Sequence, residues 1–250
     1  MTQIMFEKFN VPAMHIAKQE ALSLITSGST TGTVIDIGEQ ITRIVPFYEG
    51  TICEKGVVHS DIGGQHISEY LKNLLNQRKR GTFSTWYELR IVRDIKERTC
   101  YVQLDFKKEI DSNEKVHYIL PGGDTIKIGD ERFECTEAMF QPNLLSSIVE
   151  NPSKTGLHET VNSALMKCKV DNWRPLYNNI VLSGGSAKFK GLDKRLEKEL
   201  QNIAPRTPMK INVRTPSEDH LSWIGGSILG SLSTFRKEIC ISKEEYDETG

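Results

Sequence analysis

The sequence lacks paired cysteines, long apolar runs and targeting signals, and each absence excludes a class of protein. Its five cysteines are far apart, with no C-x-x-C or Cys/His spacing, so neither a disulfide framework nor a metal site is indicated. The least polar stretch, residues 223–232, is shorter than the roughly 20 residues that span a bilayer. Residues 1–8 lack the apolar core of a signal peptide. We therefore expect no membrane insertion and a reducing compartment, the cytoplasm or the nucleus.

An excess of charge is also lacking. The 32 Lys and Arg residues against 33 Asp and Glu give a formal net charge of −1, which provides no overall attraction for nucleic acid. With 38% hydrophobic residues, the 250-residue chain can build a sizeable core and does not have the composition of a disordered protein. Its length allows one large domain or two small ones.

The patterns that are present predict both helices and strands. Apolar spacing and turn residues predict helices over residues 12–24, 67–75, 88–99, 157–168, 192–203 and 220–234. β-Branched runs predict a hairpin of strands 33–36 and 41–46, and strands near 57–58 and at 101–106, 116–120, 125–128, 179–182 and 210–213. The second half alternates strand and helix, which indicates an α/β fold, whereas the middle is mixed. Residues 151–154 are a candidate crossing between subdomains.

Two glycine-containing connections are candidates for chemistry. In the first, residues 34–42, a tight turn can aim backbone N–H groups at phosphate, and Asp36 can hold the water shell of Mg²⁺. In the second, residues 180–191, a buried strand runs through Gly184 and Gly185 toward a helix, a geometry that suits a nucleotide. The alternatives are an ordinary hairpin with solvated acidic residues and a βα turn that needs glycine only for its bend. The residues alone leave these alternatives open.

Several longer segments are more specific than these patterns. They are residues 1–7 (MTQIMFE), 9–14 (FNVPAM), 91–97 (IVRDIKE), 129–133 (GDERF), 223–229 (WIGGSIL) and 241–247 (ISKEEYD). With both glycine connections, they make the chain resemble actin and the actin-related proteins almost from end to end. The resemblance implies an α/β, actin-like fold of the ribonuclease H-like ATPase type, with a mixed α+β insertion subdomain. It also implies a cleft for ATP or ADP with Mg²⁺, and a cytoskeletal role among actin-like protomers or filaments and actin-binding regulators.

The resemblance further implies a division of the chain and a set of site residues. Residues 1–26 and 220–250 correspond to a partial subdomain one, 27–62 and 152–219 to subdomain three, and 63–151 to subdomain four. Gln19 matches the side chain that orients attacking water, and Asp36 matches the carboxylate that organises water around the metal. The implied nucleotide contacts are Gly38, Glu39 and Gln40 on a phosphate loop, Lys96 and Glu97 in the adenine and ribose pocket, and Ser183, Gly184, Gly185, Lys188 and Phe189 on the nucleoside wall. Pattern alone favours an exposed helix residue for Gln19 and a solvated helix face for Lys96 and Glu97.

The sequence departs from the family in two ways. Actins begin with a further segment that holds a glycine-rich phosphate turn and a small outer subdomain, so we expect the fold to be incomplete. In addition, Glu39 and Gln40 stand for Asp and Gly, Arg43 for a histidine, Lys188 for a methionine and Asp219 for a lysine. A fragment, a truncated gene model and a short paralogue all fit these departures.

Three functions are compatible with these residues. The leading one is an ATP-binding cytoskeletal protein, a filament subunit or a filament-associated paralogue, with actin-type ATP hydrolysis left open. The second is a non-catalytic, actin-related interaction module with a decayed nucleotide cleft. The third, a small-molecule kinase of the same superfamily, is disfavoured because no separate substrate-base motif is present.

Overall fold

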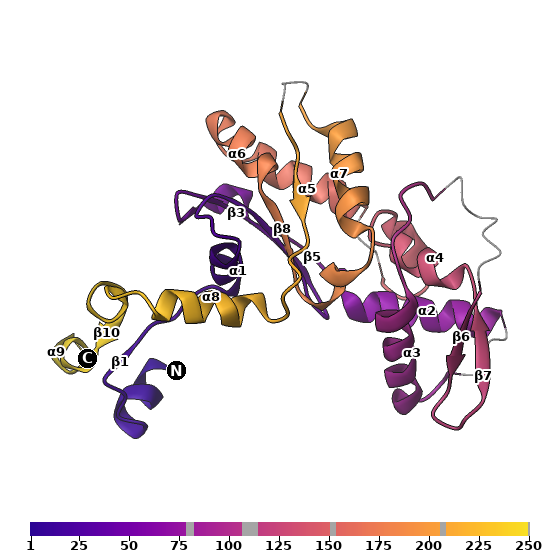
Figure 1. The fold of residues 1–250 in the computed structure, drawn as a ribbon, viewed down its shortest axis with the longest axis horizontal. Coiled ribbons are helices and arrows are strands. Elements are labelled where there is room, and N and C mark those ends of the chain that lie inside the picture. The colour runs from indigo at the N-terminus through magenta and orange to yellow at the C-terminus, as the bar shows by residue number, and fades with distance from the viewer. Residues whose placement is uncertain (79–82, 107–114, 151–153, 206–208, 250) are drawn as a thin grey trace.

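A computed structural model describes residues 1–78, 83–106, 115–150, 154–205 and 209–249. The molecule is elongated: a central sheet lies between a helical end and an arm in which the two chain termini meet (Figure 1). Most of the predicted crossing at residues 151–154 lies outside the described residues. No helix within the described ranges is long and apolar enough to cross a membrane.

The central sheet has six strands of mixed direction in the described part of the chain. β2 (Gly32–Ile37) and β3 (Thr42–Tyr48) form the predicted antiparallel hairpin, with Asp36 opposite Arg43. The other strands are β8 (Ile180–Ser183), parallel to β2; β9 (Val213–Arg214), parallel to β8; and β4 (Thr51–Ile52) and β5 (Val58–Ser60), both antiparallel to β3. The sheet therefore brings the two glycine connections to neighbouring strands, since each follows β2 or β8.

Successive side chains of β2 point to opposite faces of the sheet and so enter two different apolar layers. Val34 packs against Leu24 of α1 (Gln19–Thr26) on one face, whereas Ile35 belongs to the larger core on the other face. That larger core is covered by α5 (Leu157–Met166), α6 (Trp173–Asn178) and α7 (Leu192–Ile203). Residues two apart in a strand share a face, so Asp36 lies on the same side as Val34, toward α1.

The helical end contains two helices and a hairpin predicted for the middle of the sequence, together with α4, which was not predicted. They are α2 (Gly64–Gln77), α3 (Trp86–Thr99), α4 (Glu131–Glu137) and the antiparallel hairpin of β6 (Val116–Ile119) and β7 (Thr125–Ile128). α3 begins with a capping box, in which Thr85 Oγ1 accepts from the Glu88 backbone N–H and the Glu88 carboxylate accepts from the Thr85 N–H. This cap fixes the start of the helix that carries Lys96 and Glu97.

The arm is built from both ends of the chain (Figure 1). It contains α8 (Leu221–Gly230), α9 (Lys243–Thr249), the helical turns Ile4–Lys8 and Phe235–Ile239, and the strands β1 (Ala13–Met14) and β10 (Ile241–Ser242), which pair antiparallel. α8 joins the arm to the sheet region by packing against α1. A Cβ on Gly225 would lie 1.9 Å from the Leu22 carbonyl oxygen, so the two helices approach each other at a point where only glycine fits.

Several sequence predictions are wrong in extent. The helix predicted over residues 12–24 begins only at Gln19, because residues 13–14 pair instead with β10, more than two hundred residues away in the chain. The strand predicted at residues 101–106 is reduced to a single bridge between Tyr101 and Lys190. The helix predicted to reach residue 234 ends at Gly230. The strand predicted at residues 210–213 is shorter and later, as β9 (Val213–Arg214). In the first two cases a distant partner determines the local structure, which a local apolar pattern does not reveal.

Candidate functional site

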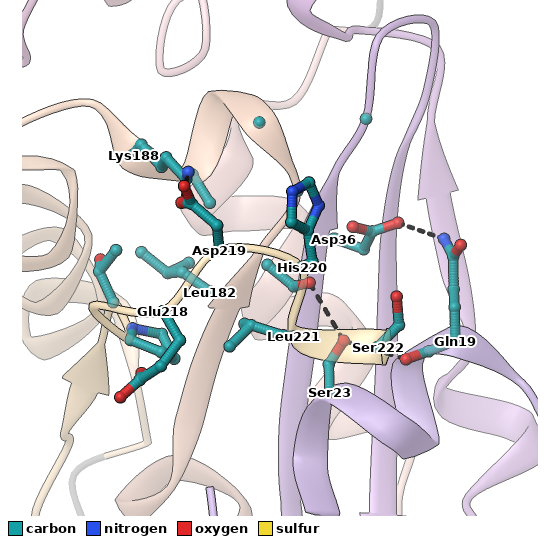
Figure 2. Close-up of a pocket in the computed structure, with 17 residues that line it drawn as sticks. Gln19, Ser23, Asp36, Leu182, Lys188, Glu218, Asp219, His220, Leu221 and Ser222 are labelled. Carbon is teal, nitrogen blue, oxygen red and sulfur yellow. Dashed lines mark hydrogen bonds and ion pairs between the residues drawn. The ribbon is translucent and has the colours of Figure 1, made fainter. Parts of the chain in front are cut away.

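A cavity of about 480 Å³ opens where the β2–β3 hairpin, the turn after β8 and the N-terminus of α1 meet (Figure 2). Gly38 from the first glycine connection and Gly184 from the second both line it. The connection from β9 to α8, residues 215–220, forms another wall. The structure therefore brings the two connections that the sequence singled out into one cavity.

Asp36 faces this cavity, and neighbouring side chains hold its carboxylate. Gln19 Nε2 donates a hydrogen bond to Asp36 Oδ2 at 2.6 Å (Figure 2), and Ser183 hydrogen-bonds the same carboxylate. Burial raises the pKa of Asp36, and the negative charge of Glu20 raises it further. Arg43 and the two hydrogen bonds oppose this rise in pKa. Gln19 and Asp36, the two residues predicted to position water and metal, are therefore in contact. Side chains alternate between the two faces of β2, and the side chain of Asp36 lies on the face toward Gln19, the first residue of α1.

Gly184 is required at its position by two independent constraints. Its φ of +89° lies in the region that side chains disfavour. A Cβ at this residue would also lie 2.4 Å from the Ile37 carbonyl oxygen and 2.9 Å from Asp36 Oδ1. A Cβ on Gly185, in contrast, would meet nothing within 4 Å. The bend thus holds β8 tightly against β2 and leaves open space beside the next residue.

A second cavity of about 370 Å³ adjoins the first, since Gly38, Gly185 and Lys188 line both. Its remaining walls include Glu39 from the hairpin turn, Phe189 and α3. Most of the predicted nucleoside residues lie here. They are Lys96, Glu97, Gly185, Lys188 and Phe189.

Lys96 and Glu97 are neighbours with different environments. Lys96 is only 3% exposed, and its Nζ donates a hydrogen bond to the Gly64 carbonyl oxygen at 2.8 Å. Burial lowers the pKa of Lys96, an effect that Glu39 and Glu97 oppose. Glu97 is exposed and accepts from Arg93 Nε at 2.9 Å. The sequence pattern favoured a solvated helix face for both residues. This interpretation is correct for Glu97 and wrong for Lys96.

The hairpin turn itself offers less to a phosphate than the sequence suggested. The Gly38 N–H donates to the Ile41 carbonyl oxygen at 3.0 Å and so closes the turn. Gln40 is exposed and lines neither of the two cavities. The Glu39 carboxylate is paired with Arg93, whose Nη1 lies 3.4 Å from Glu39 Oε1. Of the predicted phosphate loop, Gly38 and Glu39 border the cavities and Gln40 does not.

The charges around the first cavity are mainly negative. Asp36, Glu218 and Asp219 line it. Lys188 also lines it, but its ammonium forms an ion pair with Asp219 (Figure 2). A negative lining disfavours a bare polyphosphate but suits one whose charge is reduced by a bound divalent cation. Among the described residues no group of three or more His, Cys, Asp and Glu side chains is arranged to hold a metal by itself. Asp36 fits a cation held through water and shared with a ligand.

The comparison with known families decides the identity of the fold. The family model described as Actin matches residues 1–250, the whole chain. The chain belongs to the actin family. The mixed α/β architecture agrees with this assignment.

Two further residues at this actin-family site were not singled out in the sequence. Glu20 follows Gln19, has a side chain only 8% exposed and lies 3.8 Å from the Arg43 guanidinium. A glutamate in the first turn of a helix is a common dipole-compensating residue, so its sequence position gave no signal. His220 lines the cavity with a φ of +60°, which is unusual for a residue other than glycine. A dihedral angle of this kind is set by tertiary structure and leaves no pattern in the sequence.

Proposed function

We propose that this actin-family chain binds ATP or ADP together with Mg²⁺ in the two adjoining cavities. The observation that supports the proposal most strongly is the convergence of Gly38 and Gly184 on one cavity that also contains the Gln19–Asp36 pair. Because β2 and β8 are parallel neighbours, the connections that follow them meet at one edge of the sheet, and open α/β sheets bind ligands at this edge.

Each residue has a distinct role in this proposal. Asp36 would order water around the cation, and Gln19, held on the same carboxylate, would orient a water molecule toward the terminal phosphate. Bound Mg²⁺ would supply positive charge that neutralises the phosphate oxygens. Gly185 leaves room for the ligand, and Phe189 and the buried stem of Lys96 form the wall of the second cavity.

We propose a cytoskeletal role for the chain in the cytoplasm or nucleus, as a filament subunit or a filament-associated protein that contacts actin-like protomers and actin-binding regulators. Family membership supports this role. The division into subdomains given above is part of the same proposal: the helical end corresponds to subdomain four, the sheet to subdomain three and the arm to part of subdomain one.

Ligand-induced stabilisation tests the nucleotide site. Binding to the folded state alone raises the unfolding free energy, by about 2.7 kcal/mol at a ligand concentration one hundred times Kd. We expect Mg-ATP to raise the Tm of the wild-type chain and to have no effect on D36A. Thermal unfolding with and without Mg-ATP measures this shift, and release of inorganic phosphate from the same samples measures hydrolysis.

The matched control is D171N, which removes an exposed carboxylate on the helical turn Val170–Asn172, away from both cavities. D171N should keep the full Mg-ATP shift. A folded wild-type chain whose Tm does not respond to Mg-ATP would overturn the proposal, as would an undiminished shift in D36A.

A second candidate function is a non-catalytic interaction module of the actin family. It is favoured by the engaged N–H of Gly38 and by the Lys188–Asp219 pair, since both use groups that would otherwise contact phosphate. Co-sedimentation with actin filaments distinguishes the two functions. Binding to filaments that is equal in wild type and D36A, with no response to Mg-ATP, supports the interaction module; binding that D36A abolishes supports a nucleotide-linked role.

A further inference from the structure

Two of the five cysteines meet at a place that neither the cavities nor the proposed nucleotide explain. Cys53 lies between β4 and the helical turn Glu54–Gly56, and Cys168 lies just past the end of α5. Neither residue lines the two cavities of the candidate site. They come together because α5 packs across β3, β5 and the turn Glu54–Gly56.

Backbone packing brings the two cysteines to the same part of the core. Cys53 packs against the core cluster that contains Cys168, and the Cys53 thiol adds to the effect of burial in raising the pKa of Cys168. Gly56 fixes the approach: its N–H donates to the Cys53 carbonyl oxygen at 2.7 Å, and a Cβ on it would lie 2.6 Å from Cys168 Sγ. The turn therefore lies directly against the Cys168 sulfur, and Cys53 shares this turn.

Solvent can reach one of the two cysteines. Cys168 is only 8% exposed, whereas Cys53 is partly exposed. The chain offers an internal comparison in Cys100 and Cys135, whose sulfurs lie 3.5 Å apart. Cys100 is 8% exposed and Cys135 is fully buried. Of these two pairs, only Cys53–Cys168 has a solvent-accessible partner.

We propose that Cys53 and Cys168 are an oxidative modification site that forms a reversible intrachain disulfide. The oxidant is a small peroxide that removes two electrons. Cys53 is oxidised first, and Cys168 is the resolving cysteine.

The chemistry balances with hydrogen peroxide as the oxidant. Cys53 Sγ attacks one peroxide oxygen, the O–O bond breaks, and Cys53 becomes a sulfenic acid with release of one water. Cys168 Sγ then attacks the Cys53 sulfur, the S–S bond forms, the S–O bond breaks, and the Cys168 proton leaves with the hydroxide as a second water. A dithiol reductant reverses the step by thiol–disulfide exchange: it becomes a disulfide and returns one proton to each cysteine.

The link would fasten an exposed edge of the sheet to a covering helix. β4 is the terminal strand of the central sheet and pairs only through β3 in the described strand order. The disulfide would tie the segment after β4 to the end of α5 and close a long loop between residues 53 and 168. Closure of so long a loop reduces the conformational freedom of the unfolded chain. Oxidation therefore stabilises the sheet region without touching the cavities.

Peptide mapping of the full chain after treatment with hydrogen peroxide tests the proposal. The native wild-type chain should lose two hydrogen atoms in mass and yield one cross-linked peptide that contains Cys53 and Cys168. Its Tm should rise by about 5–10 °C, a typical disulfide effect for a chain of this size, and fall back after dithiothreitol. C53S should show neither the cross-link nor the shift in Tm.

C100S is the matched control, because it removes a cysteine from the other pair and should keep both the Cys53–Cys168 peptide and the Tm shift. C53S changes a partly exposed side chain, so the test does not depend on folding of a C168S variant. An unchanged mass, a Cys100–Cys135 peptide in place of the expected one, or a cross-link between chains under the same treatment would overturn the proposal.

Discussion

The central sheet buries its large apolar side chains, whereas the arm leaves several of its own exposed to solvent. In the sheet, Ile35 and Leu182 are at most 1% exposed. In the arm, Trp223 is 75% exposed, and Phe9 is 69% exposed. α8 carries apolar residues around most of its circumference, a pattern that in water-soluble proteins is normal for a buried helix. The sheet is thus held together by its own core, whereas the arm keeps apolar surface in contact with solvent.

The sheet and the arm are therefore stabilised in different ways. Burial of the sheet side chains contributes directly to folding, at roughly 25 cal/mol per Å² of apolar surface removed from water. The arm gains little from Trp223 and depends on the contact of α8 with α1 and on the short β1–β10 pairing. An exposed apolar surface of this kind also favours association with other molecules.

The first prediction compares truncation of a sheet residue with truncation of an arm residue. I35A should lower the free energy of unfolding by about 2–5 kcal/mol, because it leaves a cavity in a close-packed core. W223A should change it by less than about 1 kcal/mol, because the indole is largely solvated. Urea denaturation of both variants measures the difference. Equal losses would show that the arm shares the core of the sheet.

The second prediction concerns the attachment of the arm. G225A places a methyl group 1.9 Å from the Leu22 carbonyl oxygen, so α8 must move away from α1. We expect a loss of about 1–3 kcal/mol, typical of overpacking, and faster amide exchange in α8 than in the sheet. G226A is the control, since its Cβ would contact only Leu22 Cδ1, at 3.7 Å. G226A should cause no such loss, since alanine favours a helix more than glycine does. An equal loss in both variants would show that the close approach of Gly225 to Leu22 does not determine the effect.

The third prediction uses the pKa of Asp36, which burial raises above its usual value of 3.8 in the folded state. The folded chain therefore holds the proton more tightly than the unfolded chain, and the contribution of Asp36 to stability falls as pH rises from 3.8 through the folded pKa. At neutral pH the ionised carboxylate destabilises the chain, so D36N should unfold at a higher Tm than wild type. At pH values below 3.8 the two should converge.

Thermal unfolding across pH measures this difference between D36N and wild type, with D171N as an exposed-carboxylate control. A lower Tm of D36N at neutral pH would mean that the hydrogen bonds of Asp36 outweigh its burial. D36N should also lose the Mg-ATP shift, so stability and ligand binding should change in opposite directions.

The smallest expected effect belongs to the Lys188–Asp219 ion pair. Both side chains are more than half exposed, at 54% and 63%, so solvent screens their attraction. K188M should change the free energy of unfolding by no more than about 1 kcal/mol, and less at high salt. The double exchange K188D/D219K keeps the pair and serves as the control. A large loss in K188M that the double exchange restores would show that the pair fastens the cavity wall.

The sequence predicted the elements whose signals are local. The β2–β3 hairpin, the helices that begin at Gly64 and Trp86, and the β6–β7 hairpin follow from periodicity and turn residues. It also predicted that both glycine connections serve one site, although that expectation rested on the family resemblance. Features fixed by distant partners escaped it: the pairing of residues 13–14 with β10, the burial of Lys96 beneath α2, and the carboxylate of Glu20 beside Asp36. No local pattern encodes a partner dozens or hundreds of residues away.

The glycine contact between α1 and α8 has a mechanical consequence. α1 starts with Gln19 at the cavity, and α8 starts directly after the 215–220 wall of the same cavity. Thr26 Oγ1 also donates to the Leu221 carbonyl oxygen at 2.8 Å, so the two helices are clamped at their crossing. α8 thus links the cavity wall at one end to the arm at the other, so a tilt of α8 at the cavity would also move the chain termini.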